Sequence, residues 1–385
     1  MVLNACWPPL WSAKVLFLLL TWFASPLLAL RLLLTRKREP AHILLIQTAK
    51  IGDMICTTPL FSAIQKRFPS ARLTVLADPV TAPLIEADPN INQVWRYPAR
   101  AFKGFAGRWR LFRLLTREQV DTTICVSPNQ AFLLVPFWAG VSRRLSILPN
   151  LGGGLSYRLA APLLSHGECH LAGRSVLETE WHLLKHLGIP ATGRKIIHVR
   201  NESRLKAHTL LPAKKQAWAG LGISSGNKLK ALSVGQLKEL AETLLQKGYQ
   251  VVLVGAKEDS PISAELIAVL PKGAAIDAAG LFALADLPAM IEMLDFYVGV
   301  DSGITYLADA FNVPLVDFMG PADADDQSPD GRQAIVVRSP EPCAPCSHAF
   351  DAPYFCKVGT RACVLGIAGL DQLPEVALQR KTKSE

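Results

Sequence analysis

Short runs of apolar, branched residues alternate along the chain with longer segments whose apolar residues recur at helical spacing. The runs have the length of strands buried on both faces, and the longer segments have the pattern of amphipathic helices. The first strand-like runs occupy residues 42–47, 72–77, 91–97, 121–127 and 143–148. Strands that alternate with helices are typical of βαβ units, so we expect one parallel sheet within residues 41–150.

The alternation restarts near residue 216. Strand-like runs lie at residues 216–223, 249–256, 296–300 and 314–320, with helical segments at 233–248, 261–270, 284–294 and 303–311. A chain of 385 residues also exceeds the comfortable size of one hydrophobic core. The sequence therefore predicts an α/β protein with two Rossmann-like domains that face a central cleft. No GxGxxG fingerprint accompanies either sheet, which disfavours a dehydrogenase.

The start of the chain is the most apolar part of the sequence. Residues 15–30 carry no charge, and the apolar run resumes after Arg31 before a basic stretch that ends at residue 38. Roughly 20 such residues suffice for one membrane span, and the basic stretch would hold the following part in the cytoplasm. We expect residues 1–38 to form an uncleaved membrane anchor or a shallow interfacial helix, with a cleaved signal peptide as the alternative.

Composition adds little beyond this apolar segment. Half of the residues are hydrophobic, 19% are charged, and the formal net charge is +9. The Lys and Arg residues are dispersed, and no basic motif interleaved with aromatic residues indicates an RNA-binding module, so we expect no nucleic-acid partner. An anionic membrane surface or an anionic substrate explains the excess charge as well.

A glycine and an aspartate, Gly52 and Asp53, follow the first predicted strand. A helical pattern begins directly behind them, so both residues belong to a strand-to-helix turn. In an open α/β sheet, turns at the carboxyl ends of parallel strands line the ligand crevice, and glycine there lets the backbone approach a ligand. Position alone makes Asp53 a candidate site residue.

The second half has a corresponding turn at Asp301, Ser302 and Gly303, between a buried strand and a helix. The free amides and the positive end of that helix would accept a diphosphate, with the Ser302 hydroxyl close by. Without a ligand, Asp301 would be only a helix cap and Gly303 only a packing glycine. The motif by itself favours neither interpretation.

Two further turns follow strands of the second half. Ser224 and Ser225 precede Lys230, and they offer hydroxyl donors and a cation to a phosphate, although the P-loop pattern is not satisfied. After the next strand, Glu258 and Asp259 would bind a ribose diol or cap the following helix. The four turns together predict a nucleotide-diphosphate site with a carboxylate opposite.

With this set of turns the chain resembles glycosyltransferase family 9, the heptosyltransferases of lipopolysaccharide core assembly. The similar stretches are AKIGDMICTTPLFSAIQKRFPSARLTVLAD, KALSVGQLKELAETLLQKGYQVVLVGAKED and DSGITYLADAFNVPLVDFMGP, and the resemblance covers about residues 41–370. It implies a GT-B fold and an inverting, metal-independent transfer without a cofactor. The chain departs from the family pattern at Tyr306, where histidine is common, and at Leu232 and Ser233, which replace a Trp-Pro pair.

The resemblance also implies roles for individual residues. Asp53 matches the general base that deprotonates the acceptor hydroxyl, and Lys230 matches the lysine that contacts the donor phosphate. Ser225, or Ser224 if the alignment shifts by one residue, matches a donor-contacting hydroxyl. The triplet that begins at Asp301 matches the donor-binding triplet.

The function implied is transfer of a sugar, heptose from ADP-heptose, to a lipopolysaccharide core or related lipid-linked saccharide. The reaction would take place at the cytoplasmic face of a bacterial inner membrane. Residues 39–200 would form the acceptor domain and residues 201–385 the nucleotide-sugar donor domain. Two alternatives stay open: a nucleotide-sugar epimerase of the same architecture, and a non-catalytic, membrane-tethered protein that binds sugar nucleotides.

The end of the chain contains a cysteine-rich loop at residues 343–363. Its four thiols are those of Cys343, Cys346, Cys356 and Cys363. The first pair has the spacing of a metal knuckle, which would suit a structural zinc. The irregular spacing of the remainder favours an unmetallated or redox-sensitive loop. The acidic stretch DADD at residues 323–326 follows the last predicted strand, and we expect it to be a solvated loop.

Overall fold

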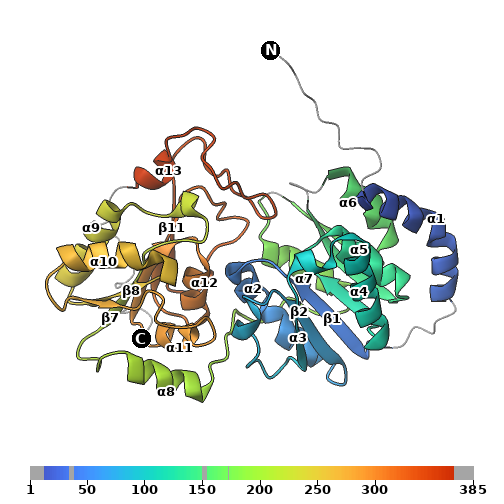
Figure 1. Ribbon diagram of the computed structural model, residues 1–385, viewed down its shortest axis with the longest axis horizontal. Helices are drawn as coiled ribbons and strands as arrows, with labels where there is room; N and C mark the ends of the chain where they lie inside the picture. The colour runs from blue at the N-terminus through green and yellow to red at the C-terminus, as the bar shows by residue number, and fades with distance from the viewer. Residues whose placement is uncertain (1–12, 34–38, 150–153, 172, 368–385) are drawn as a thin grey trace, which may run out of the picture. The chain divides into compact units, whose positions relative to one another are not determined.

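A computed structural model of the protein describes residues 13–33, 39–149, 154–171 and 173–367. The chain divides into two compact units, which we call unit 1 and unit 2. Unit 1 contains Met1–Ala49, Leu60–Ala82 and Pro89–Gly193, and unit 2 contains Lys50–Pro59, Pro83–Asp88 and Arg194–Glu385. Each described unit is built around its own parallel sheet (Figure 1).

The sheet of unit 1 has six strands in the order β3-β2-β1-β4-β5-β6. The strands are β1 (His42–Gln47), β2 (Arg72–Ala77), β3 (Gln93–Arg96), β4 (Thr122–Cys125), β5 (Arg143–Pro149) and β6 (His166–His170). All pairs are parallel, and β1 is buried along its whole length because it lies inside the sheet. The five strands expected from the apolar runs are present.

Helices and short 3₁₀ turns connect these strands. They are α3 (Pro59–Arg67), η1 (Ala82–Leu84), η2 (Ala99–Phe102), α4 (Gly104–Arg117), α5 (Gln130–Trp138), α6 (Gly154–Ala160), η3 (Ala161–Leu163) and α7 (Val176–Lys185). The expectation that the first sheet ends by residue 150 was wrong, because β6 extends it after α6. The sequence of β6, HGECH, is polar, and edge strands need no apolar run.

The apolar helix α1 (Ala13–Leu33) lies along unit 1, beside α5 and α6 (Figure 1). Leu18 and Thr21 are buried there, and the Trp138 indole N–H donates a hydrogen bond to Thr21 Oγ1 over 2.9 Å. Trp22 donates to the backbone oxygen of Leu159, also over 2.9 Å. The stretch Val15–Leu32 is long and apolar enough to cross a membrane, and only 11% of it is buried. One face of α1 is therefore docked while the rest of its apolar surface is exposed.

The sheet of unit 2 also has six parallel strands, in the order β12-β11-β10-β7-β8-β9. They are β7 (Trp218–Gly222), β8 (Gln250–Val254), β9 (Ala275–Asp277), β10 (Phe296–Val300), β11 (Leu315–Met319) and β12 (Ala334–Arg338). The edge strand β12 was not expected. The DADD segment therefore precedes a strand, and the expectation of a solvated loop was wrong for Asp326, which is only 3% exposed.

Unit 2 also contains helices and short 3₁₀ turns. They are α2 (Ile51–Thr57), α8 (Asn201–Leu210), η4 (Lys228–Lys230), α9 (Val234–Gln246), η5 (Lys257–Asp259), α10 (Ser260–Val269), α11 (Leu287–Ile291), α12 (Gly303–Ala310) and α13 (Ala362–Leu365). α9 begins with a capping box in which Ser233 and Gln236 bond each other's backbone amides. α2 ends before Pro59, which occupies the first position of α3, where proline is tolerated.

Helix α2 packs against α12 within unit 2, and two glycines allow the close contact. A Cβ atom on Gly303 would lie 2.5 Å from Ile51 Cγ2, and one on Gly52 would lie 2.9 Å from Tyr306 Cδ2. Neither distance is compatible with a side chain at these positions. The space beside both glycines is therefore filled by protein, and a packing role accounts for both residues.

Candidate active site

Two side chains bind the carboxylate of Asp301, which follows β10. Lys230 Nζ donates a hydrogen bond to Asp301 Oδ2, and the Tyr306 hydroxyl donates to Asp301 Oδ1 over 2.8 Å. The Lys230 and Asp301 side chains are 16% and 12% exposed, so the ion pair is largely shielded from water. Burial, and then the charge of Asp301, raise the pKa of Tyr306 well above its ordinary value, which keeps the phenol protonated. Strands β7 and β10 are neighbours, which places the loops after them at the same sheet edge.

Asp53 stands on the first turn of α2, within the same unit as this cluster. Its Oδ2 atom accepts the backbone N–H of Lys50 over 3.0 Å, as a carboxylate does at the third position of a helix. Burial raises the pKa of Asp53, and the Lys50 amide and side chain oppose that shift. The charge of Asp301 raises the pKa slightly further, and the charge of Lys230 lowers it. The structure therefore brings Asp53 into electrostatic range of Lys230 and Asp301.

The serine turn lies beside the same carboxylate. Ser225 Oγ donates to the backbone oxygen of Asp301 over 3.4 Å. Ser224 accepts a hydrogen bond from Lys228, whose Nζ atom also donates to Asp259 Oδ1 over 2.7 Å. Burial raises the pKa of Asp259, but the hydrogen bonds from Lys228 and the Ala256 amide outweigh it and lower the pKa overall. Asp259 is thus held by a lysine, and its neighbour Glu258 is exposed.

Ser302 is the N-cap of α12, but its hydroxyl bonds no backbone amide of that helix. Ser302 Oγ lies 3.2 Å from Thr305 Oγ1, and Thr305 donates to the backbone oxygen of Val300 over 2.6 Å. The first amides of α12 therefore receive no cap from this side chain. Such amides, with the positive end of the helix dipole, are suited to an anion.

Lys195, which was not identified from the sequence, binds a carboxylate of α12. Its ammonium group donates to Asp309 Oδ2 over 2.7 Å and to Asp330 Oδ1 over 2.6 Å, and it lies 5.9 Å from the centre of the Tyr306 ring. Lys195 follows α7 in a segment without regular structure, so no local pattern marks it. It fixes the helix from which Tyr306 reaches Asp301.

A second residue missed by the sequence is Asp317, on β11. Both of its carboxylate oxygens are buried and lack a hydrogen-bond partner among the described residues, and so does the Tyr297 hydroxyl. Burial, and then the charge of Asp301, raise the pKa of Asp317 well above its ordinary value. Asp317 was missed because its neighbours in the strand are apolar, and a single polar residue in a buried run does not change the strand pattern.

Two of the four cysteines of the 343–363 loop are influenced by their cysteine neighbours. Burial raises the pKa of Cys346 and of Cys363, and in each case the nearby cysteines of the loop raise it further. In contrast, backbone N–H groups, beginning with that of Arg361, lower the pKa of Cys356. Cys356 is therefore the thiol of this loop that favours the thiolate that a metal or an oxidant needs.

The cysteine loop also contacts the rest of the site. Asn227, the N-cap of η4, donates to the backbone oxygen of Pro353 over 2.9 Å, and the Lys50 ammonium lies 4.8 Å from the centre of the Tyr354 ring. The loop therefore touches the segments that carry Lys230 and Asp53.

One group of side chains among the described residues has the composition of a cation site. His348 Nδ1 lies 3.1 Å from Asp323 Oδ2 and 3.5 Å from Asp326 Oδ2. Asp326 Oδ2 also accepts the backbone N–H of Ala349 over 2.8 Å. His348 Nδ1 is within hydrogen-bond distance of Asp323 Oδ2, so the geometry does not require a metal.

Comparison with known proteins identifies the class. Among solved structures, the chain is similar to a family 9 glycosyltransferase from Veillonella parvula (TM-score 0.72, 19% identity, 91% of this chain and 98% of that one). It is also similar to the ADP-heptose lps heptosyltransferase II of Escherichia coli (TM-score 0.66, 23% identity, 88% of this chain and 99% of that one). The two parallel sheets and these neighbours define the GT-B fold.

The family follows from the sequence match. Residues 154–353, just over half of the chain, match glycosyltransferase family 9 (heptosyltransferase). The chain is 26% identical over 314 residues to lipopolysaccharide heptosyltransferase 2 of Escherichia coli (strain K12), covering 77% of this chain and 87% of that protein. Lipooligosaccharide heptosyltransferase 2 of Haemophilus influenzae gives the same identity with 88% of its length covered. The protein belongs to glycosyltransferase family 9.

Proposed function

We propose that this glycosyltransferase transfers a heptose from ADP-heptose to a lipid-linked saccharide of lipopolysaccharide, with inversion and without a metal ion. The observation that carries the proposal is the cluster of Asp53, Lys230 and Asp301 in one unit. It supplies a base, a cation and a helix N-terminus, which are the groups that a single displacement at a sugar–diphosphate bond needs. The named relatives and the solved ADP-heptose enzyme support the choice of sugar.

In this proposal Asp53 accepts the proton of the acceptor hydroxyl as the oxygen attacks the anomeric carbon. The bond between that carbon and the diphosphate oxygen breaks, and the nucleoside diphosphate leaves with the electron pair. Burial makes Asp53 a stronger base than an exposed aspartate, because it raises the pKa of the carboxyl. One displacement inverts the configuration at the reacting carbon.

Lys230 would exchange its bond to Asp301 for the donor phosphates. The ammonium and the first amides of α12 then stabilise the negative charge that grows on the leaving group. Ser224, Ser225 and Ser302 would add hydroxyl donors, Gly303 a backbone contact at the start of α12, and Glu258 a ribose contact. The donor would thus bind residues 201–385, and residues 39–200 would serve the acceptor.

The membrane part of the proposal rests on α1. Its docked face, at Leu18 and Thr21, would have to leave unit 1 if the helix crossed a bilayer. An interfacial helix needs no such change, since Phe23 and Leu27, 89% and 75% exposed, can enter the lipid while the other face stays docked. We therefore propose peripheral attachment at the cytoplasmic face of the inner membrane.

Replacement of Asp53 by Asn tests the central step. We expect loss of transfer by about a hundredfold or more, with the affinity for ADP unchanged, because general-base catalysis contributes 10²–10⁴-fold. The control is Asp325→Asn, which removes an exposed carboxylate paired with Arg338 and should leave transfer intact. An epimerase would instead turn over the donor without an acceptor, and a non-catalytic binder would show no transfer in either protein.

A further inference from the structure

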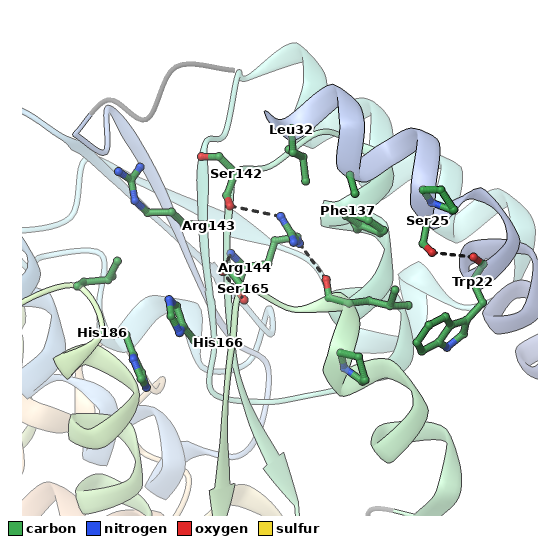
Figure 2. Close-up of a pocket in the computed structure, with 15 residues that line it drawn as sticks. Trp22, Ser25, Leu32, Phe137, Ser142, Arg143, Arg144, Ser165, His166 and His186 are labelled. Carbon is green, nitrogen blue, oxygen red and sulfur yellow. Dashed lines mark hydrogen bonds between the residues drawn. The ribbon is translucent and has the colours of Figure 1, made fainter. Parts of the chain in front are cut away.

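A cavity of about 690 Å³ lies in unit 1 between α1 and the amino ends of β5 and β6 (Figure 2). Arg143 and His166, the first residues of those two strands, line it. Ligand crevices of open α/β sheets lie at the opposite, carboxyl ends of the strands. The cavity therefore lies at the end of the sheet where such crevices are not found, and every residue that lines it belongs to unit 1.

One wall of the cavity is apolar and comes mostly from α1. Trp22, Pro26, Ala29 and Leu32 of that helix line it, together with Phe137 of α5. In Figure 2, Leu32, Phe137 and Trp22 lie on the side of the cavity where α1 passes. The same helix exposes a long apolar surface away from unit 1, so the apolar wall is continuous with the part of the chain best suited to enter lipid.

The other wall is basic. It contains Arg143, Arg144, His166 and His186, and no Asp or Glu is among the residues that line the cavity. The two imidazoles stack with their centres 4.2 Å apart. Near this wall, Arg31 of α1 lies over the turn before β5, since a Cβ atom on Gly140 would be 3.5 Å from its guanidinium carbon. In Figure 2 the Arg144 side chain points toward Phe137, and the Arg143 side chain points the other way.

Arg144 is the most informative of these residues because it is only 7% exposed. Its guanidinium donates to the backbone oxygens of Val141 and Leu163 over 2.6 and 3.1 Å, and it lies 4.8 Å from the centre of the Phe137 ring. Among the described residues no carboxylate pairs with it. Burial lowers the pKa of Arg144 to about 10, so it is still charged at neutral pH. A buried cation without a counter-charge is costly, and an anion in the cavity would offset that cost.

We propose that this cavity binds one anionic phospholipid of the membrane, with its phosphate at Arg144 and an acyl chain along α1. A free phosphate would satisfy Arg144 but would leave the apolar wall exposed to water. A neutral lipid would fill the apolar wall but would leave Arg144 without a counter-charge. The inference uses the docking of α1 on unit 1 and does not depend on the transferase reaction.

The test measures lipid retained by the full-length chain. The protein is incubated with vesicles of phosphatidylcholine alone or with added phosphatidylglycerol, transferred to detergent, and weighed by native mass spectrometry. We expect one phosphatidylglycerol per chain and no retained phosphatidylcholine. Arg144→Gln should reduce the retained fraction about tenfold, the loss expected for one charge-assisted hydrogen bond. Arg113→Gln, on the exposed face of α4, removes the same charge and should retain the lipid.

A second variant covers the case in which Arg144→Gln does not fold. Ala29→Trp keeps every charge and fills the apolar wall, so it should also expel the lipid while the melting temperature stays near that of the parent. Equal retention by Ala29→Trp and the parent protein would overturn the proposal. Retention of phosphatidylcholine to the same extent would overturn it too, as would displacement of the lipid by millimolar inorganic phosphate alone.

Discussion

The Tyr306 hydroxyl donates a hydrogen bond to Asp301 Oδ1 over 2.8 Å, and the backbone oxygen of Gln327 lies 3.1 Å from the same hydroxyl. The departure from the family pattern at this position therefore supplies a neutral donor to the carboxylate that also holds Lys230. Because burial raises the pKa of Tyr306, this donor is constant over the working pH range. We expect Tyr306→Phe to lower kcat/KM for the donor by roughly tenfold, as for one buried hydrogen bond of about 1–3 kcal/mol.

The measurement for Tyr306→Phe is steady-state kinetics with varied donor at saturating acceptor. Tyr306→His, which restores the residue common in the family, serves as the comparison. Unchanged kinetics in the phenylalanine variant would show that the phenol only fills space above Gly52.

Lys230→Gln should weaken ADP binding and lower kcat together, because the same ammonium would hold the diphosphate before and after the bond breaks. We expect a loss of about tenfold or more in ADP affinity, since hydrogen bonds to charged groups are worth about 1.5–3 kcal/mol. Calorimetric titration with ADP measures it. Lys238→Gln, an exposed lysine paired with Glu242 on α9, is the matched control and should bind ADP normally. Full affinity in the Lys230 variant would remove this residue from the donor site.

The rate of transfer should depend on the protonation of Asp53. Burial raises the pKa of this carboxyl, and a base works only when it is deprotonated, so kcat should fall as the pH drops through a pKa above the ordinary aspartate value. A pH profile of kcat measured from pH 4 to pH 9 locates that limb. An acidic limb at or below about 4, the ordinary range, would contradict the assignment.

Asp317 should make the fold less stable as the pH rises. Its pKa is raised in the native state, so the native protein binds more protons than the unfolded chain between the ordinary aspartate value and the native one. The free energy of unfolding then decreases through that window, and Asp317→Asn should remove the decrease. Urea titrations at several pH values measure it. Asp325→Asn is the comparison: Arg338 lowers the pKa of Asp325, so this carboxylate makes the free energy of unfolding increase with pH. Identical pH profiles of stability for the parent and the Asp317 variant would exclude the effect of Asp317.

Transfer should persist in a strong chelator if the reaction needs no metal ion. Lys230 and the α12 amides then carry the charge of the leaving diphosphate. Incubation with excess EDTA followed by an activity assay tests this, and loss of activity that Mg²⁺ restores would contradict it. Asp323→Asn would then show whether the carboxylates beside His348 hold that ion.

Most of the architecture could be predicted from the sequence because buried parallel strands are locally recognisable. Strands β1, β8 and β10 are short apolar runs, and the turns behind β1 and β10 were identified by their polar residues. The edge strand β6 was missed because its sequence is polar. The edge strand β12 was missed because no helix separates it from β11, so the alternation of strands and helices does not lead to it.

What the sequence did not reveal is which segments touch. Gly52 was expected to let the backbone approach a ligand, and for Gly303 a ligand contact and a packing role were both open. The structure fills the space beside these glycines with Tyr306 and Ile51. Asp317 and Lys195 were missed for the same reason. The surroundings of these two side chains are formed only when distant segments of the chain pack together.

The packing of α2 against α12 sets a limit on how the protein can be divided. Residues 50–59 belong to unit 2, although the chain on either side of them belongs to unit 1. A fragment that starts at Arg194 would therefore lack Asp53 and would uncover the ring of Tyr306. Swapping C-terminal halves between related enzymes at that point would join each donor half to a foreign α2, and the graft should include residues 50–59 to keep the matched pair.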